Sequence, residues 1–127
     1  MLPKEHRLTS SRDFKAVFAG GRTYVHRLIV LKVLPKSRNL PSRFGFSTSS
    51  KLGHAVVRNR AKRLLREAVR LEGERVAQVG RDVVLIARPP IREARLDDVR
   101  RAIEELFRKA GLLAAMEQAG KAAEPET

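Results

Sequence analysis

The chain has 127 residues, no cysteine, and 27 Lys and Arg residues against 14 Asp and Glu, which gives a formal net charge of +13. This length is typical of one domain that can bury a core. The absence of cysteine excludes disulfides and cysteine-based metal sites. The charge favours a polyanionic binding partner, nucleic acid before an anionic membrane, and the alternative is a basic protein with scattered surface charge. No apolar run is long enough to span a membrane, and polar residues at positions 4–7 interrupt any signal-peptide core, so we expect no membrane segment and a cytoplasmic location.

The first half of the chain predicts one helix followed by strands. Ser10 and Asp13 have the spacing of a helix-capping box, and apolar residues then recur at helical spacing, which predicts a helix over about residues 10–19. Residues 22–34 are rich in β-branched residues and predict one strand or a pair of short strands. Residues 43–49 alternate phenylalanine with polar residues, which predicts a strand with one apolar and one polar face.

The second half predicts a basic helix, a buried strand and a last helix. Apolar and basic residues alternate at helical spacing over about 55–72, and an unbroken apolar run at 83–87 is typical of a central strand. Residues 96–110 predict an amphipathic helix. We therefore expect a single α+β or α/β domain over residues 1–113, with helices covering a mixed sheet, and a disordered tail over 114–127.

The basic helix carries the densest positive charge in the chain. Residues 51–70 hold seven basic side chains and one acidic side chain, Glu67, which cannot balance them. A helical wheel predicts one broad apolar face, formed by Val56, Val57, Ala61, Leu64, Leu65, Ala68 and Leu71. The opposite face carries Asn59, Lys62, Arg63, Arg66 and Arg70, with Arg58 and Arg60 at its two borders. Because arginine can grip phosphate oxygens with two donors, this face predicts a binding site for a nucleic-acid backbone.

The residues alone leave the kind of nucleic acid open. An arginine-rich helix can also read the DNA major groove, so a DNA-binding regulator is one alternative. RNA is favoured because the chain is rich in strands and lacks a two-helix DNA-reading motif. The polar strand face that includes Arg43, Ser47 and Ser49 could also form a floor for a single strand, and Asn59 could bond a base edge or a ribose hydroxyl.

The run from Gly45 to Glu67 closely resembles the bacterial ribonuclease P protein component. The matching signature includes the Arg58-Asn59-Arg60 core, Lys62-Arg63, Arg66, the upstream Arg7-Leu8, Asp13-Phe14 and Val17-Phe18, the strand 83–87 followed by Arg88, and Leu106-Phe107. The resemblance covers about residues 4–112. Two positions depart from the family pattern: His54 replaces the more usual Asn, and Lys32 stands where an aromatic residue is often found.

The resemblance implies an α-β-β-β-α-β-α fold like domain 2 of ribosomal protein S5, with a mixed sheet and a left-handed βαβ crossover around the basic helix, against the usual right-handed rule. It implies a subunit of ribonuclease P, an endoribonuclease that removes the 5′ leader of precursor tRNA. The partners would be the catalytic RNA and precursor tRNA, with one protein monomer per RNA. Catalysis, and most of the magnesium, would belong to the RNA.

The resemblance also implies two sites. The catalytic RNA would contact Arg58, Asn59, Arg60, Lys62, Arg63 and Arg66, and we expect Lys51 and Arg70 of the same basic cluster to extend this contact. The substrate leader would lie in a cleft lined by Phe14, Phe18 and Lys32, although Phe14 and Phe18 suit an ordinary core equally well. We also expect Arg43, on the polar strand face, to line this cleft.

The sequence predicts no catalytic residue and no metal site in the protein itself. The three histidines have no spacing typical of a metal site, and Asp97 and Asp98 point apart on a helix. Another structured-RNA-binding protein, such as a ribosomal one, is the main alternative to the ribonuclease P subunit, and a protein-only nuclease is the weakest.

Overall fold

The computed structural model describes residues 3–37, 39–72 and 80–113. The helices and strands follow the chain as α1 (Ser11–Gly20), β1 (Arg22–Val25), β2 (Ile29–Pro35), β3 (Arg43–Ser47), α2 (Ala55–Leu71), β4 (Arg81–Ala87) and α3 (Leu96–Ala110). Short 3-10 helices are η1 (Lys4–His6), η2 (Ser50–Leu52) and η4 (Pro89–Glu93). This order confirms the expected α-β-β-β-α-β-α fold; the predicted tail at 114–127 lies outside the described residues.

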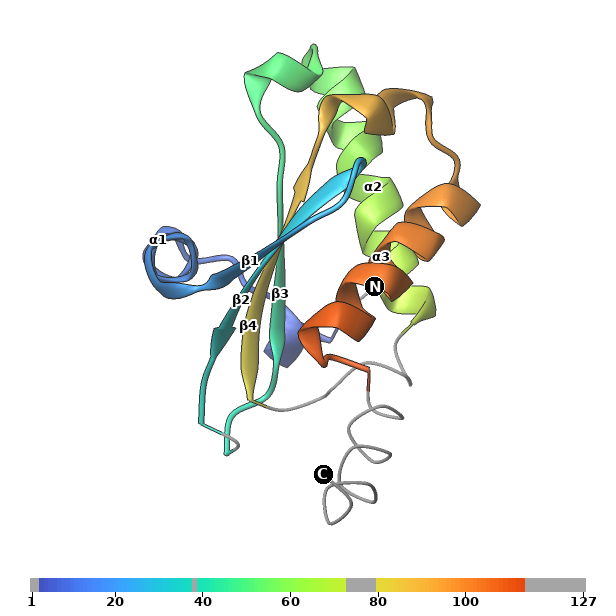
Figure 1. Ribbon diagram of the computed structural model, residues 1–127. Helices are drawn as coiled ribbons and strands as arrows, with labels where there is room; N and C mark the ends of the chain where they lie inside the picture. The colour runs from blue at the N-terminus through green and yellow to red at the C-terminus, as the bar shows by residue number, and fades with distance from the viewer. Residues whose placement is uncertain (1–2, 38, 73–79, 114–127) are drawn as a thin grey trace.

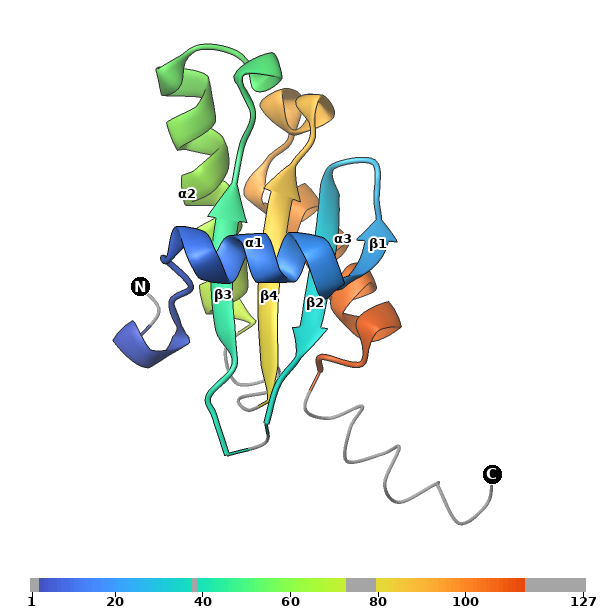
Figure 2. The same cartoon turned by 90° about the vertical axis from the view of Figure 1, so that its left-hand side faces the viewer.

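The sheet is mixed and has the strand order β1-β2-β4-β3. β1 with β2, and β2 with β4, are antiparallel, whereas β3 and β4 are parallel. α1 covers one face of the sheet, and α2 and α3 cover the other (Figure 1). In Figure 2, β3 and β4 both point upward, α2 lies behind them, and the chain moves from β3 on the left to β4 on its right. The crossover is therefore left-handed, as expected from the resemblance and against the general rule.

The main core lies between the sheet and the helices α2 and α3. Its fully buried side chains come from all these elements and include Leu31, Leu65, Leu85, Ile103, Leu106 and Phe107. None of the described helices is long and apolar enough to cross a membrane.

The apolar face of α2 differs in two places from the face expected from the sequence. Val56 is 78% exposed, and Leu71 is 39% exposed, whereas Val69 is buried. Val56 precedes the buried Ala61 by five residues, which is about 140° around an α-helix, so it points away from the core. The expected apolar face was therefore too broad, and the free surface of α2 is wider than predicted.

A second, smaller core joins α1 to the other face of the sheet. Its buried residues are Leu8, Val17 and Val84. At the start of α1 the Ser10 hydroxyl accepts a 3.5 Å hydrogen bond from the Asp13 N–H, which is one half of the expected capping box. The other half is not formed, because the Asp13 carboxylate turns to Arg43.

Candidate RNA-binding surfaces

One row of basic side chains follows the side of α2 that faces β3. Arg58, Lys62 and Arg66 are spaced four residues apart, so they lie above one another on the helix. The Arg66 guanidinium lies 5.8 Å from the centre of the Phe46 ring on β3, which places this row beside the sheet edge. The side chains of Arg58 and Lys62 make no hydrogen bond or ion pair with any described residue. Their donors are therefore available to a ligand.

The outward side of α2 carries a second set of polar residues. Asn59 and Arg63 are exposed, and neither is bonded to another described side chain. Arg70, in the last turn of α2, donates to the Glu67 carboxylate, with Nε 3.1 Å from Oε2. This hydrogen bond lowers the pKa of Glu67 and raises that of Arg70. The positive charge is therefore uncompensated along most of the helix and partly neutralised near its C-terminal end.

Arg60 lies on the other border of α2 and is engaged with the protein backbone. Its Nη1 donates to the carbonyl of Arg92 at 3.3 Å, and its Nη2 donates to the carbonyl of Ala94 at 2.9 Å. Arg92 in turn donates to the carbonyl of Leu52, just before α2, at 3.4 Å. These hydrogen bonds link η4 and the residue after it to α2, through Arg60, and to η2, through Leu52. Sequence reasoning could not find them, because backbone carbonyl acceptors have no sequence signature. The remaining expected residue, Lys51, is exposed in η2.

The expected leader cleft begins where α1 crosses the sheet. The helix passes so close to β3 that a Cβ atom on Gly45 would lie 2.5 Å from Cζ of Phe14. Phe14 is half-buried in this contact, whereas Phe18, one turn later, is 42% exposed. The two phenylalanines therefore differ: Phe14 packs as a core residue, and Phe18 offers its ring to a ligand.

Lys32 stands next to the exposed phenylalanine. Its Nζ donates to Oγ1 of Thr23 at 2.9 Å and lies 5.9 Å from the centre of the Phe18 ring. The ammonium group is thus held by a hydroxyl on β1 and an aromatic ring on α1, with one further donor direction open to an anion. The structure brings Phe18 and Lys32 together, the two residues that the family resemblance assigns to the leader cleft.

A row of four side chains, three of them aliphatic and one a serine, crosses the sheet beside α1. The strand register places Val25, Val30, Ile86 and Ser47 at one level across all four strands. Val25 is 59% exposed, and the other three are half-buried. The sequence did not identify this row, since it needs the pairing register of four strands. Together with Phe18 it forms an apolar floor that suits stacked or extended bases.

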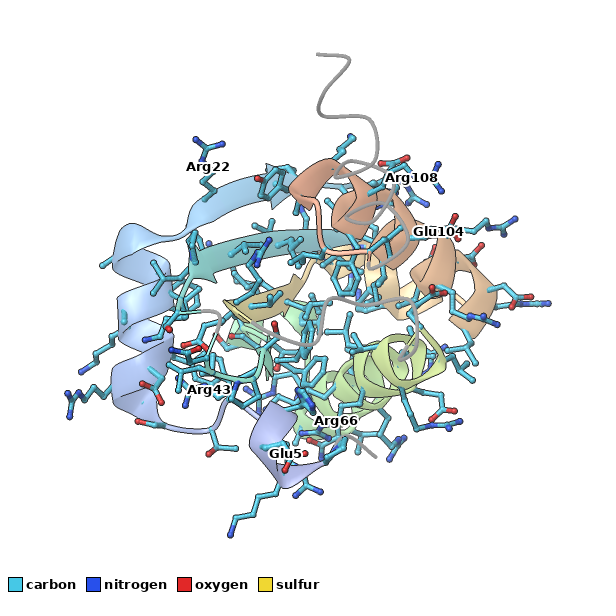
Figure 3. All side chains as sticks on the ribbon, turned by 90° about the horizontal axis from the view of Figure 1, so that it is seen from below. Glu5, Arg22, Arg43, Arg66, Glu104 and Arg108 are labelled. Carbon is cyan, nitrogen blue, oxygen red and sulfur yellow. The ribbon has the colours of Figure 1, made fainter. Side chains whose placement is uncertain are left out.

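Arg43 takes a different place from the other expected cleft residues. Its Nε and Nη2 donate to the two oxygens of Asp82 at 2.9 and 2.7 Å, and its Nη1 donates to Asp13 at 3.1 Å. The hydrogen bond to Asp82 is the main reason that the pKa of Arg43 is raised. Figure 3 shows Arg43 beside α1 and far from Arg66, which lies on α2. The fork of donors on Arg43 is therefore already occupied within the protein.

Within residues 3–37, 39–72 and 80–113, no three His, Asp or Glu side chains gather as metal ligands would. Asp82, the carboxylate before the central strand, is bonded to Arg43 and does not face solvent.

The chain matches known proteins over nearly all of its length. The family model described as Ribonuclease P matches residues 2–111. The ribonuclease P protein component of Symbiobacterium thermophilum is 47% identical over 112 residues, which cover 88% of this chain and 96% of that protein. The Bacillus velezensis component is 38% identical over 87% of this chain and 94% of that protein.

Solved structures give the same result. The RNase P protein of Staphylococcus aureus matches with a TM-score of 0.74 and 26% identity, over 86% of this chain and 98% of that one. The Thermotoga maritima protein matches with a TM-score of 0.70 and 28% identity, over 80% of this chain and 96% of that one.

Proposed function

The chain belongs to the bacterial ribonuclease P protein family, and on that premise we propose that it grips the catalytic RNA with α2 and the 5′ leader of precursor tRNA with the sheet face beside α1. As the protein subunit of ribonuclease P, it supports the endonucleolytic maturation of tRNA 5′ ends. Its partner is the RNase P RNA. The family identity also implies RNA binding, which we assign to these two surfaces.

The α2 contact is supported chiefly by the unpaired charge on that helix. Arg58, Lys62 and Arg66 form one row, and Arg63 and Asn59 lie next to it on the outward side. Together with Lys51 in η2, the basic side chains of α2 could reach about six phosphates. Among them, Arg60 and Arg70 are bonded within the protein and would act mainly through their charge. Phosphates attract such a row because neutralising them releases condensed counterions.

The leader contact is supported by the exposed ring of Phe18 and the ammonium group of Lys32. An aromatic face accepts any base, so stacking there suits leaders of differing sequence. Lys32 would meet a phosphate beside the stacked base, and the apolar row at Val25, Val30 and Ile86 would support the neighbouring nucleotides.

The proposal leaves chemistry to the RNA. Magnesium would be bound mainly by the RNA, which holds the scissile phosphate, while the protein reduces the magnesium needed by neutralising phosphates. The complex would contain one protein and one RNA and would act in the cytoplasm, where precursor tRNA is made.

Reconstitution at low magnesium tests the function. The chain alone should leave precursor tRNA intact, and adding it to the catalytic RNA should restore cleavage at a magnesium concentration at which the RNA alone is slow. A chain that binds ribosomal RNA and leaves precursor cleavage unchanged would instead be a general structured-RNA-binding protein.

Phe18→Ala tests the leader site. Loss of one stacked base should weaken holoenzyme binding to leader-bearing precursor by about tenfold, because one stack contributes roughly 1–3 kcal/mol. Mature tRNA should bind as before. Leu40→Ala, which shortens another exposed apolar side chain away from α1, is the matched control. An equal loss for precursor and mature tRNA would assign Phe18 to the packing of α1.

A further inference from the structure

Arg43 links three segments that are far apart in the sequence. It lies on β3, and its guanidinium holds Asp82 on β4 with two hydrogen bonds and Asp13 on α1 with one. The Asp82 side chain is 3% exposed, whereas Arg43 and Asp13 are each 29% exposed. Asp82 therefore fixes Arg43 to the sheet, and Nη1 of the guanidinium donates to Asp13 on the helix.

This link lies on the opposite side of α1 from the leader site. α1 crosses the sheet above Gly45, and Arg43 comes two residues earlier on the same face of β3. The floor residue Ser47 comes two residues later. On α1 itself, Asp13 and Phe18 are five residues apart, about 140° around the helix, with the buried Val17 between them. Arg43 therefore cannot line the same cleft as Phe18.

The other contacts of α1 are mainly apolar. The helix buries one side chain fully, Val17, in a cluster with the buried Leu8 and Val84, against which the half-buried Phe14, Leu34 and Ile86 pack. A small apolar contact of this kind resists lifting of the helix but opposes its rotation weakly, because hydrophobic attraction has no direction. A bidentate Arg–carboxylate pair has fixed geometry, so the ionic link supplies the directional part.

We infer that Asp13, Arg43 and Asp82 form a clamp that sets the rotation of α1 over the sheet and thereby places the Phe18 ring in the leader cleft. Arg43 is a positioning residue, and the leader does not touch it. This inference rests on the proposed leader site beside Phe18. The clamp anchors one edge of the helix, and the ring that meets the substrate projects from the other.

Asp13→Asn and Arg43→Lys test the clamp. Asp13→Asn keeps the side-chain size and the Ser10 cap but removes the charge that Arg43 grips. Arg43→Lys keeps the positive charge but cannot bridge two carboxylates. Arg43→Ala is avoided, because it would leave the buried Asp82 carboxylate without its partner and endanger folding. In Arg43→Lys, Lys36, whose Nζ lies 3.9 Å from Asp82, still compensates that carboxylate.

Each variant should weaken holoenzyme binding to leader-bearing precursor by about three- to tenfold, the range for losing a partly exposed charged hydrogen bond. Binding to mature tRNA and to the catalytic RNA should not change. The double variant should lose no more than either single variant, since both break the same link. Hydrogen exchange should become faster in α1 and stay unchanged in α2.

The sign of the Asp13→Asn effect separates the clamp from simple electrostatics. If only the electrostatic field of the protein mattered, removing a negative charge near an RNA site should strengthen precursor binding. The clamp predicts that Asp13→Asn weakens it. Glu5→Gln, which removes an exposed acidic side chain in η1, is the matched control and should leave precursor binding unchanged or slightly stronger.

Two outcomes would overturn the clamp: unchanged or tighter precursor binding by Asp13→Asn, or equal acceleration of exchange in α1 and α2. The leader site is judged separately by Phe18→Ala. If that variant discriminates against leader-bearing precursor and Asp13→Asn does not, the clamp fails and the leader site stands. If Phe18→Ala has no effect, the leader site itself fails.

Discussion

The two helices that carry the proposed RNA contacts are attached to opposite faces of one sheet by different kinds of interaction. α2 buries Ala61, Leu65, Ala68 and Val69 in the main core, together with α3. α1 buries only Val17, and depends also on the ionic link through Arg43 and on its close approach to β3. One helix is held by a large non-directional contact and the other by a few directional ones.

The difference matches what each surface has to do. Binding through the α2 row depends on how many charges face the RNA, and charge attraction tolerates small displacements of the helix. Binding through Phe18 depends on where one ring lies, and stacking is lost with a small rotation of α1. Core substitutions under α2 should therefore damage the whole protein, whereas substitutions around α1 should damage leader recognition first.

Leu65→Ala should have the largest effect. Leu65 is fully buried on α2, so its truncation leaves a cavity in the main core. The free energy of unfolding should fall by about 3 kcal/mol, and the melting temperature by about 10 °C. Val56→Ala on the same helix is the control, since Val56 is exposed and should change stability by less than about 0.5 kcal/mol. Equal melting temperatures for the two variants would contradict the assignment of the core face of α2.

Gly45→Ala should have an intermediate effect of a different kind. The added methyl group would lie 2.5 Å from Cζ of Phe14, so Phe14 and α1 must move. We expect a loss of about 1–2 kcal/mol in stability and a loss of discrimination between leader-bearing precursor and mature tRNA, measured by binding to the holoenzyme.

Gly20→Ala is the matched control for that substitution. A Cβ on Gly20 would lie 3.4 Å from Cδ1 of Leu34, an ordinary contact, and Gly20 is the last residue of α1. Alanine in a helix is favoured over glycine by up to about 1 kcal/mol, so this variant should be neutral or slightly stabilised. Full leader discrimination by Gly45→Ala would mean that the close approach of α1 to β3 does not position the cleft.

The same contrast explains what the sequence could predict. The order of helices and strands follows from hydrophobic periodicity, and the charged face of α2 follows from residue spacing along one helix. Both are local properties. The left-handed crossover came from the family resemblance, since the general rule for parallel strands favours the other hand.

The cleft was harder to predict because it is assembled from residues distant in the chain. Periodicity could not separate Phe14 from Phe18, since the difference depends on the absence of a side chain at Gly45 on another strand. Arg43 was expected among the cleft residues because its neighbours alternate on a polar strand face. Its two acidic partners lie 30 and 39 residues away, and no local pattern indicates them.

The smallest effects should come from single arginines of α2, and two of them give a sharp comparison. Arg63 is exposed and has no side-chain partner among the described residues, whereas Arg60 donates to two backbone carbonyls. If about six phosphates are neutralised, the affinity for the catalytic RNA should fall with salt with a log–log slope of roughly −4 to −5. A wild-type slope near zero would contradict electrostatic docking of α2.

Arg63→Ala should make that slope shallower by about one unit and leave stability unchanged, because the variant removes one phosphate contact and nothing else. Arg60→Ala should instead lower the free energy of unfolding by about 0.5–1 kcal/mol, since two hydrogen bonds to carbonyls are lost and one of them is exposed, and should change the slope less than Arg63→Ala does. Salt titrations of RNA binding and urea unfolding of both variants measure the two quantities. If Arg60→Ala makes the slope shallower by a full unit at unchanged stability, Arg60 exchanges its carbonyl acceptors for phosphates when the RNA binds. The phosphates are then held by Arg60 as well as by the row of Arg58, Lys62 and Arg66.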